Sequence, residues 1–216
     1  MPMLVDPQVV AAFCLAALLM SLAPGPDMMF ITATGLSSGP RAGLLAAVGV
    51  SAGLAVHTSA AALGLGAVLE AFPAAFTAVR IAGACYLVVL AVLAFRDAVR
   101  AGAAAGAAPR AAGGAGRLRV FVRAMLTNLA NPKVIVFYLA FFPQFIDPSR
   151  GHVAAQFFLL GALFIMVGLC VDAAAGLLSG RLGDALRRRP LVQRVLHAFS
   201  GTVFAGLALR LAADSR

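Results

Sequence analysis

Residues 21–27 read SLAPGPD and residues 128–133 read NLANPK, and each stretch interrupts sequence that is otherwise apolar enough for lipid. A proline inside a helix removes one backbone hydrogen bond, and in hydrocarbon no water satisfies the carbonyl that loses its donor. Such breaks persist only where they line a cavity or face other parts of the protein. In transporters, matching breaks in the two halves of a chain are the best sequence pointer to a substrate site.

The composition around these breaks is that of an integral membrane protein. Of the 216 residues, 62% are hydrophobic and 12% are charged. Soluble domains carry roughly 25% charged residues, about twice this share. The net charge is +9, but no stripe of aromatic and basic residues accompanies it, so we expect no nucleic-acid partner. The N-terminus has no positive region and carries Asp6, so we expect no cleaved signal peptide.

Six apolar segments are candidate membrane-spanning helices, for which about 20 residues are needed. They predict an all-α fold in which residues 1–216 form a single transmembrane domain in a lipid bilayer. The segments are residues 7–34, 42–69, 75–95, 124–142, 153–178 and 195–211.

Arginines in the loops predict the orientation. Twelve of them lie in the first, third and fifth loops, and four lie on the opposite side. Because loops rich in Lys and Arg stay in the cytoplasm, we expect the arginine-rich side to be cytoplasmic and both termini to be outside.

The chain divides into two halves of three helices each. Residues 101–116 are rich in Ala and Gly, which is typical of a flexible linker between residues 1–100 and residues 117–216. An odd number of helices per half places the second half upside down relative to the first. A strict repeat also needs part of residues 117–126 to lie in the interface or in a cavity, because the second break follows closely after Arg123.

Corresponding positions in the two halves support an inverted repeat. The matches occur in the same order, and their offsets rise slowly, as short loop insertions would produce. They are Pro26 with Pro132, Gly53 with Gly168, His57 with Asp172, and Gly83 with Gly201.

Two ionisable residues fall at membrane depth, His57 in the second segment and Asp172 in the fifth. Such residues are costly in lipid and by default indicate function. We predict that Asp172 takes part in proton coupling together with His57. The alternatives are a neutral, hydrogen-bonded structural acid at Asp172 and a tolerated neutral imidazole at His57.

Glycines share the helix faces of these two residues. Gly49 and Gly53 precede His57 at intervals of four, and Gly168 and Gly176 flank Asp172 in the same way. Small residues let another helix approach closely, so we predict that the four glycines pack helices. This packing serves contacts within the chain or a homodimer equally well.

The first break offers acceptors for an ammonium group. Pro24, Gly25 and Pro26 expose backbone carbonyls. Asp27 is interpreted as the N-cap of the half-helix that follows, and the positive end of that half-helix suits a substrate carboxylate.

The second break adds donors. Asn128 and Asn131 carry both donors and acceptors, and Pro132 precedes Lys133. Lys133 is interpreted as the partner of a carboxylate, either that of the substrate or that of Asp27, or as a side chain that snorkels to the cytoplasmic surface. Together the breaks predict a site for a small zwitterion.

The same motifs resemble the lysine exporter/homoserine–threonine resistance (LysE/RhtB) family of amino-acid exporters. The similarity rests on PGP at residues 24–26, on NLANPK at residues 128–133 and on FPQF at residues 142–145, and it extends in order over nearly the whole chain. The resemblance implies efflux of amino acids or related metabolites across the bacterial cytoplasmic (inner) membrane, driven by the proton-motive force.

Other functions fit the residues less well. A divalent-cation exporter of similar architecture is the main alternative, but it needs several clustered acids or histidines, and here only Asp27, His57 and Asp172 are available. A membrane thiol–disulfide carrier needs a cysteine at each break, and Cys14 lies ten residues before Pro24.

The chain has no nucleophile–base set, so we expect no enzyme, no catalytic residue, no metal site and no cofactor. The prediction is a secondary transporter that exports amino acids or related small metabolites in exchange for protons.

Overall fold

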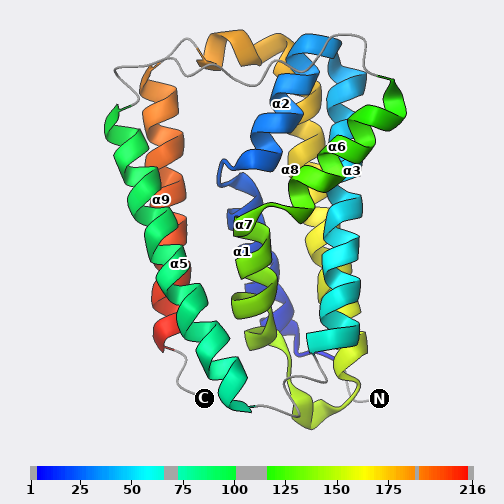
Figure 1. Cartoon of the computed structure of the whole chain (residues 1–216), viewed down its shortest axis with the longest axis vertical. Coiled ribbons are helices and arrows are strands. Elements are labelled where there is room, and N and C mark those ends of the chain that lie inside the picture. Colours follow the sequence, from blue (N-terminus) through cyan, green and yellow to red (C-terminus); the bar gives the residue numbers. More distant parts are fainter. Residues whose placement is uncertain (1–3, 66–72, 101–115, 188–189, 214–216) are drawn as a thin grey trace.

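The computed structural model describes residues 4–65, 73–100, 116–187 and 190–213, and these are helical over almost their whole length (Figure 1). No strand occurs in these ranges, so the predicted all-α class is confirmed. The α-helices are α1 (Pro7–Leu22), α2 (Pro26–Ser38), α3 (Pro40–Ala60), α5 (Pro73–Arg100), α6 (Arg117–Leu129), α7 (Pro132–Val136), α8 (Val153–Arg187) and α9 (Pro190–Ala213). Short π- and 3₁₀-helical segments are η1 (Ala61–Leu65), η2 (Phe137–Phe141), η3 (Phe142–Phe145) and η4 (Pro148–Arg150).

Prolines decide where many of these helices begin. The first residue of a helix has no intrahelical partner for its N–H, so a proline there loses nothing. At α1 the start is also capped, because the Asp6 carboxylate accepts a hydrogen bond of 2.8 Å from the backbone N–H of Gln8. The helices that start with a proline are α1, α2, α3, α5, α7 and α9.

Both proline-containing stretches break their helices. The axes of α1 and α2 differ by 54°, and the axis of α6 differs by 49° from that of the segment Pro132–Phe145. Each pair is apolar and long enough to count together as one broken span.

Two unbroken helical stretches are long and apolar enough to cross a membrane, Pro40–Gly64 and Val153–Ser179. With the two broken pairs, the described residues therefore contain up to four candidate spans. The predicted third and sixth segments form α5 and α9, but their apolar stretches, Ile81–Arg96 and His197–Leu209, are shorter than the ~20 residues that a span needs.

Helix α6 begins at Arg117, before the start near residue 124 that was predicted for the fourth membrane-spanning segment. Leu118 and Arg119 are exposed, whereas Val120, Ala124 and Asn128 are buried at intervals of four residues. A span prediction from hydropathy alone omits the arginine-rich first turns of such an amphipathic helix. The structure therefore has a helix of 13 residues before the second break and a helix of 16 residues before the first. Of the other predicted parts, residues 66–69 and 101–115 lie outside the described residues.

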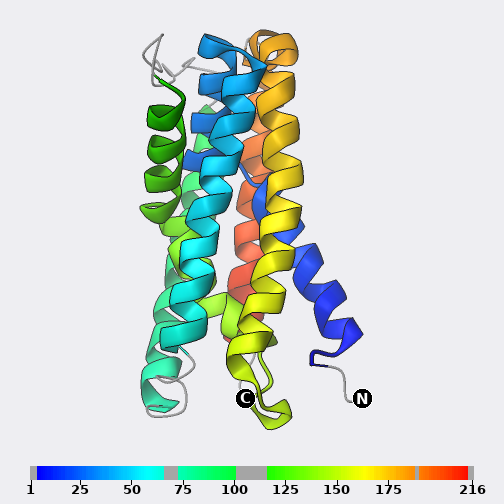
Figure 2. The same cartoon turned by 90° about the vertical axis from the view of Figure 1, so that its right-hand side faces the viewer.

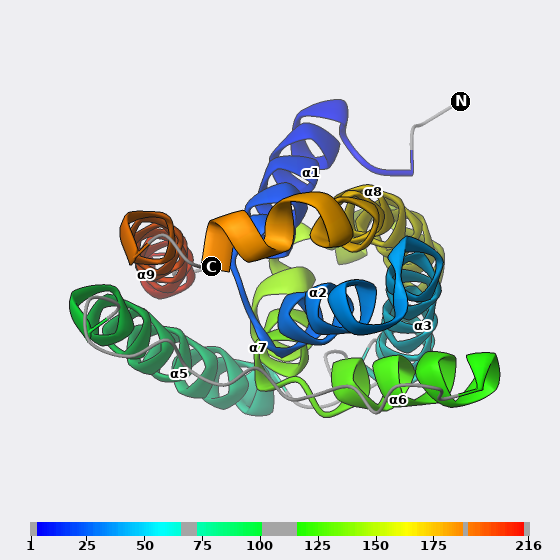
Figure 3. The same ribbon diagram turned by 90° about the horizontal axis from the view of Figure 1, so that it is seen from above.

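When each broken pair is counted as one segment, successive segments run in opposite directions along the long axis (Figure 1). The start of α1 and the end of α9 lie at one end, and Ser38, Arg100, Arg117 and Arg187 mark helix ends at the other. Seen from above, α5 and α9 form a pair beside the group of α2, α3, α6 and α8 (Figure 3). Helices α3 and α8 lie side by side, and α1 leans away from them towards its start (Figure 2).

Two hydrophobic cores are packed on either side of the breaks. The larger includes Phe13 of α1, Phe137 and Phe142 of the segment after the second break, and Phe164 of α8, and it extends to α5 and α9. The smaller joins α2, α3 and α6, and its buried residues are Ile31, Ala46, Ala47, Val50, Val120 and Ala124. The breaks therefore fall where one core ends and the other begins.

Glycines let α3 and α8 approach closely beyond the breaks. A Cβ added at Gly43 would lie 2.6 Å from the carbonyl oxygen of Gly176, and one added at Gly176 would lie 2.6 Å from the carbonyl carbon of Gly43. Both neighbours are backbone atoms, so neither can move aside without moving a helix. Gly176 thus packs two helices of the same chain.

Replacing Gly176 with alanine is expected to force α3 and α8 apart and to lower stability by about 1–3 kcal/mol, the usual effect of overpacking. Melting followed by size-exclusion chromatography in detergent measures this. Gly206 of α9 is the matched control, because a Cβ there meets nothing within 4 Å. Gly206→Ala should raise stability by roughly 0.5–1 kcal/mol through the lower flexibility of the unfolded chain. Equal melting temperatures of the two variants would contradict the packing role.

Candidate functional site

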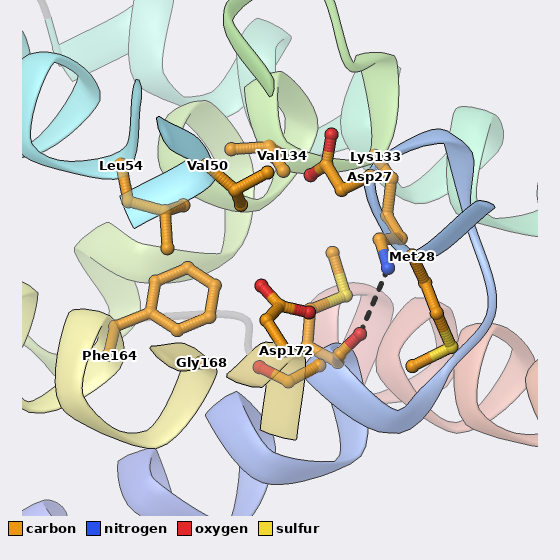
Figure 4. A pocket seen from close by; sticks show the side chains of 11 residues that line it. Asp27, Met28, Val50, Leu54, Lys133, Val134, Phe164, Gly168 and Asp172 are labelled. Carbon is orange, nitrogen blue, oxygen red and sulfur yellow. Dashed lines mark hydrogen bonds between the residues drawn. The ribbon is translucent and has the colours of Figure 1, made fainter. Parts of the chain in front are cut away.

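A small cavity lies between the two breaks, where the two cores meet (Figure 4). Its volume of about 30 Å³ suits two or three water molecules, each of which needs roughly 10–15 Å³ by this measure. Its lining residues come from both halves of the chain. They are Met20, Ser21, Asp27, Met28, Val50, Leu54, Lys133, Val134, Phe164, Gly168 and Asp172.

Lys133 binds the end of α1 rather than a carboxylate. Its Nζ donates hydrogen bonds to the carbonyl oxygens of Met20, at 3.0 Å, and of Ala23, at 2.8 Å. In a continuous helix the carbonyl of Met20 would accept from the N–H of residue 24, but Pro24 has none. The ammonium of the second break therefore supplies the donor that the proline of the first break removes.

The structure corrects the sequence interpretation of Lys133. The side chain is only 8% exposed, so the snorkelling interpretation is wrong. The described residues also contain no ion pair between Lys133 and Asp27. Gly25 is explained by the path of the lysine, because a Cβ at residue 25 would lie 3.2 Å from Nζ and 3.3 Å from Cε of Lys133.

Asp27 joins the first break to the second through Asn128. The Asn128 Nδ2 atom donates a hydrogen bond of 2.8 Å to Oδ2 of Asp27. The N-cap interpretation of Asp27 is wrong, because the N-cap of α2 is Gly25 and Asp27 lies in the first helical turn. The other carboxylate oxygen of Asp27 and the Oδ1 atom of Asn128 are buried and have no partner among the described residues.

Asn131 caps α7, the half-helix that begins at Pro132. Its Oδ1 atom accepts a hydrogen bond of 3.0 Å from the backbone N–H of Lys133, which is the usual role of an N-cap side chain. Its Nδ2 atom is buried and finds no partner within the described part of the chain. The second break thus holds an unused donor beside its capped helix.

Asp172 reaches the cavity from α8 and is 7% exposed (Figure 4). It interacts electrostatically with both Asp27 and Lys133. Among the residues that the structure describes, none donates a hydrogen bond to its carboxylate. The cavity thus gathers two carboxylates and one ammonium, and the carboxylate of Asp172 has both oxygens free for a ligand.

His57 lies in a different cavity, so the structure does not bring it to Asp172. Its ring stacks on Tyr138 with centroids 5.3 Å apart, and the two line a cavity of about 270 Å³ with residues of η1 and η2. Tyr138 in turn shares a hydrogen bond of 2.8 Å with the hydroxyl of Thr58. The equivalent helix faces of the predicted repeat meet different neighbours.

The predicted packing glycines differ in what they touch. A Cβ at Gly49 would lie 2.5 Å from the backbone oxygen of Phe121, and one at Gly53 would lie 2.5 Å from Oδ1 of Asn128. Both glycines therefore admit α6 against α3. Gly168 has no such neighbour and lies open to the central cavity.

The apolar residues that line the cavity were not among the site residues predicted from the sequence. Val50, Leu54 and Phe164 close one side of it, opposite the charged residues (Figure 4). A periodicity signal was present, because Val50 and Leu54 are four residues apart on α3, and Phe164 is eight residues before Asp172 on α8. In a chain so rich in apolar residues, that spacing does not single them out.

This chain is similar to known proteins over nearly its whole length. The family model described as LysE type translocator matches residues 18–215. A Vibrio cholerae protein named uncharacterized membrane protein is 38% identical over 207 residues, which cover 96% of this chain and 98% of the relative. Leucine efflux proteins of Salmonella typhimurium and Salmonella choleraesuis are 31% identical over 201 residues, which cover 93% of this chain and 92% of each relative. No solved structure matches significantly.

The family match covers residues 18–215, so it includes both broken helices and the buried charged residues that lie between them. The chain is a multi-pass membrane protein that belongs to the LysE type translocator family, a family of transporters and not of enzymes.

Proposed function

We propose that this protein exports amino acids from the cytoplasm, with leucine or a similar aliphatic amino acid as its cargo, in exchange for protons. Relatives that share 31% of their residues with almost the whole chain are leucine efflux proteins. The central cavity supports the same cargo, because charged groups lie on one side of it and apolar side chains on the other.

The charged side suits the two ends of a zwitterion. The Asp172 carboxylate accepts hydrogen bonds from the substrate ammonium, because the oxygens of Asp172 have no partner within the described residues. A lysine ammonium has three N–H donors, and Lys133 uses two of them on Met20 and Ala23. The third N–H is left for the substrate carboxylate. Asn128 and Asn131 position this pair through Asp27 and through the cap of α7.

Exchange with protons follows from the charge at Asp172. An ionised carboxylate is costly in a buried site unless a cation or a proton accompanies it. The substrate ammonium fills that role in one half of the cycle and a proton fills it in the other. Because both use the same carboxylate, transport of one excludes the other. We limit the coupling role to Asp172, since His57 lines a separate cavity.

The small volume of the cavity supports alternating access. A space of about 30 Å³ is far below the ~300–1,000 Å³ of ligand pockets. Substrate therefore enters only when the segments around the breaks move. The break angles of 54° and 49° mark the two points at which the backbone is no longer held by continuous helix.

For the membrane arrangement we propose six spans in two inverted halves, residues 1–100 and 117–216, in the bacterial cytoplasmic membrane. Each half has one broken segment, one long helix, and one helix that packs on its counterpart, α5 on α9. The helix ends at Arg100, Arg117 and Arg187 share one end of the molecule, which the positive-inside rule assigns to the cytoplasm. Both termini then lie outside.

A divalent-cation exporter fits the cavity less well. The described residues contain no group of three or more His, Cys, Asp or Glu that would hold a metal ion. The ammonium of Lys133 beside Asp172 also repels a cation.

Efflux from proteoliposomes tests the proposal. The purified full-length protein is reconstituted, loaded with radiolabelled leucine and given an opposing proton gradient. We expect leucine to leave faster than from protein-free liposomes, and we expect collapse of the gradient to slow it. If no amino acid leaves faster than from the protein-free control, the proposed function is wrong.

A further inference from the structure

Helix α8 presents three different surfaces to the cavity in successive turns. Phe164, Gly168 and Asp172 are four residues apart, so they share one face and are separated by about 6 Å along the helix axis. The close view shows Gly168 between the phenyl ring and the carboxylate (Figure 4). A ligand bound to Asp172 by its ammonium therefore extends across Gly168 towards Phe164.

Packing within the protein does not require a glycine at residue 168. An added Cβ would lie 3.5 Å from Cδ1 of Leu54 and 3.6 Å from Oγ of Ser21, both ordinary contact distances. Elsewhere on α8 the situation is the opposite, because a Cβ at Gly161 would collide with the side chain of Thr58 and one at Gly176 with the backbone of Gly43. What the glycine preserves at residue 168 is space in the cavity.

We infer that Gly168 is the specificity-determining residue of the transporter, and that its missing side chain makes room for the aliphatic side chain of the substrate between Leu54 and Phe164. The inference rests on the proposed function and adds the position that sets the upper size of the cargo. Leucine needs this space, whereas alanine leaves most of it unused.

Substitutions that fill the space test the inference. Gly168→Ala and Gly168→Val are compared with wild type for efflux of leucine and of alanine from proteoliposomes. Because one methylene in an apolar pocket changes specificity by roughly 10- to 200-fold, we expect the leucine-to-alanine ratio to fall at least about tenfold in Gly168→Ala and further in Gly168→Val. Gly206→Ala, on a helix that does not line the cavity, should leave the ratio unchanged.

A compensating variant keeps the test independent of folding. The added Cβ at residue 168 lies against Cδ1 of Leu54, so Gly168→Ala combined with Leu54→Ala should restore the leucine-to-alanine ratio. A folded Gly168→Ala protein that exports both amino acids in the wild-type ratio overturns the inference while the proposed function stands. A wild-type protein that exports neither overturns the proposed function itself.

Discussion

Replacing Lys133 with methionine is expected to destabilise the protein and to abolish transport. The substitution keeps an unbranched side chain that is one atom shorter, but it removes both hydrogen bonds to the end of α1. Hydrogen bonds to a charged donor contribute about 1.5–3 kcal/mol each, so we expect a loss of roughly 3–6 kcal/mol. Met20 and Ala23 are buried, and a buried carbonyl that loses its donor carries a desolvation cost.

A lower melting temperature in detergent measures this loss. At about 2–4 °C per kcal/mol for a chain of this size, the midpoint should fall by about 6 °C or more. Arg119→Met is the matched control, because it also replaces a cation with methionine but at an exposed position of α6. It should leave the midpoint within about one degree of wild type. A Lys133→Met protein with wild-type melting and wild-type efflux would show that the break between α1 and α2 does not depend on the ammonium.

The positions of the breaks could be predicted from the sequence because the effect of proline on a helix is local. Pro24, Pro26 and Pro132 remove backbone donors wherever the rest of the chain lies. The structure accordingly ends α1 at Leu22 and α6 at Leu129. The ionisable residues at membrane depth were equally visible, since only composition is needed to find Asp172 among apolar neighbours.

The partners of these residues depend on how the halves pack, and the sequence does not contain that information directly. Lys133 and Asp27 carry opposite charges, so the sequence alone favours an ion pair between them. In the structure each bonds to a different group, Lys133 to backbone carbonyls and Asp27 to Asn128. One signal was available: Pro24 leaves the carbonyl of Met20 without a donor, and such a carbonyl in lipid needs another.

Helix faces were predictable, but the helices opposite them were not. The spacing of Gly49, Gly53 and His57 places them on one face of α3. In the structure the glycines meet α6, and His57 stacks on Tyr138 and shares a hydrogen bond with the backbone of Asn128. The coupling role predicted for His57 rested on its being an ionisable residue at membrane depth, and the register of the repeat, which pairs it with Asp172, does not specify which neighbours the two faces have.

The second large effect is expected from Asp172→Asn, which should abolish export without weakening the fold. Asparagine has nearly the same shape but can neither balance the substrate ammonium nor exchange a proton at this position. We expect proton-driven leucine efflux to fall at least about 100-fold, because removing one partner of a buried charge pair costs about 3–5 kcal/mol. Leucine–leucine exchange without a gradient should fall as well, since the same carboxylate binds the substrate.

A stability measurement separates loss of function from misfolding, because Asp172→Asn should lose export without losing thermal stability. Asp172 is buried and unbonded within the described residues, so removing its charge relieves a desolvation cost, and the melting temperature should stay the same or rise. Asp147→Asn is the control in the loop after η3. Hydrogen bonds from Ser149 hold the pKa of Asp147 below its usual value, so it stays ionised throughout the assay, and asparagine keeps its capping oxygen. Efflux by that variant should equal wild type.

If Asp172→Asn retained full proton-driven export, the carboxylate of Asp172 would have no part in coupling, and the exchange of ammonium for proton would have to occur at Asp27.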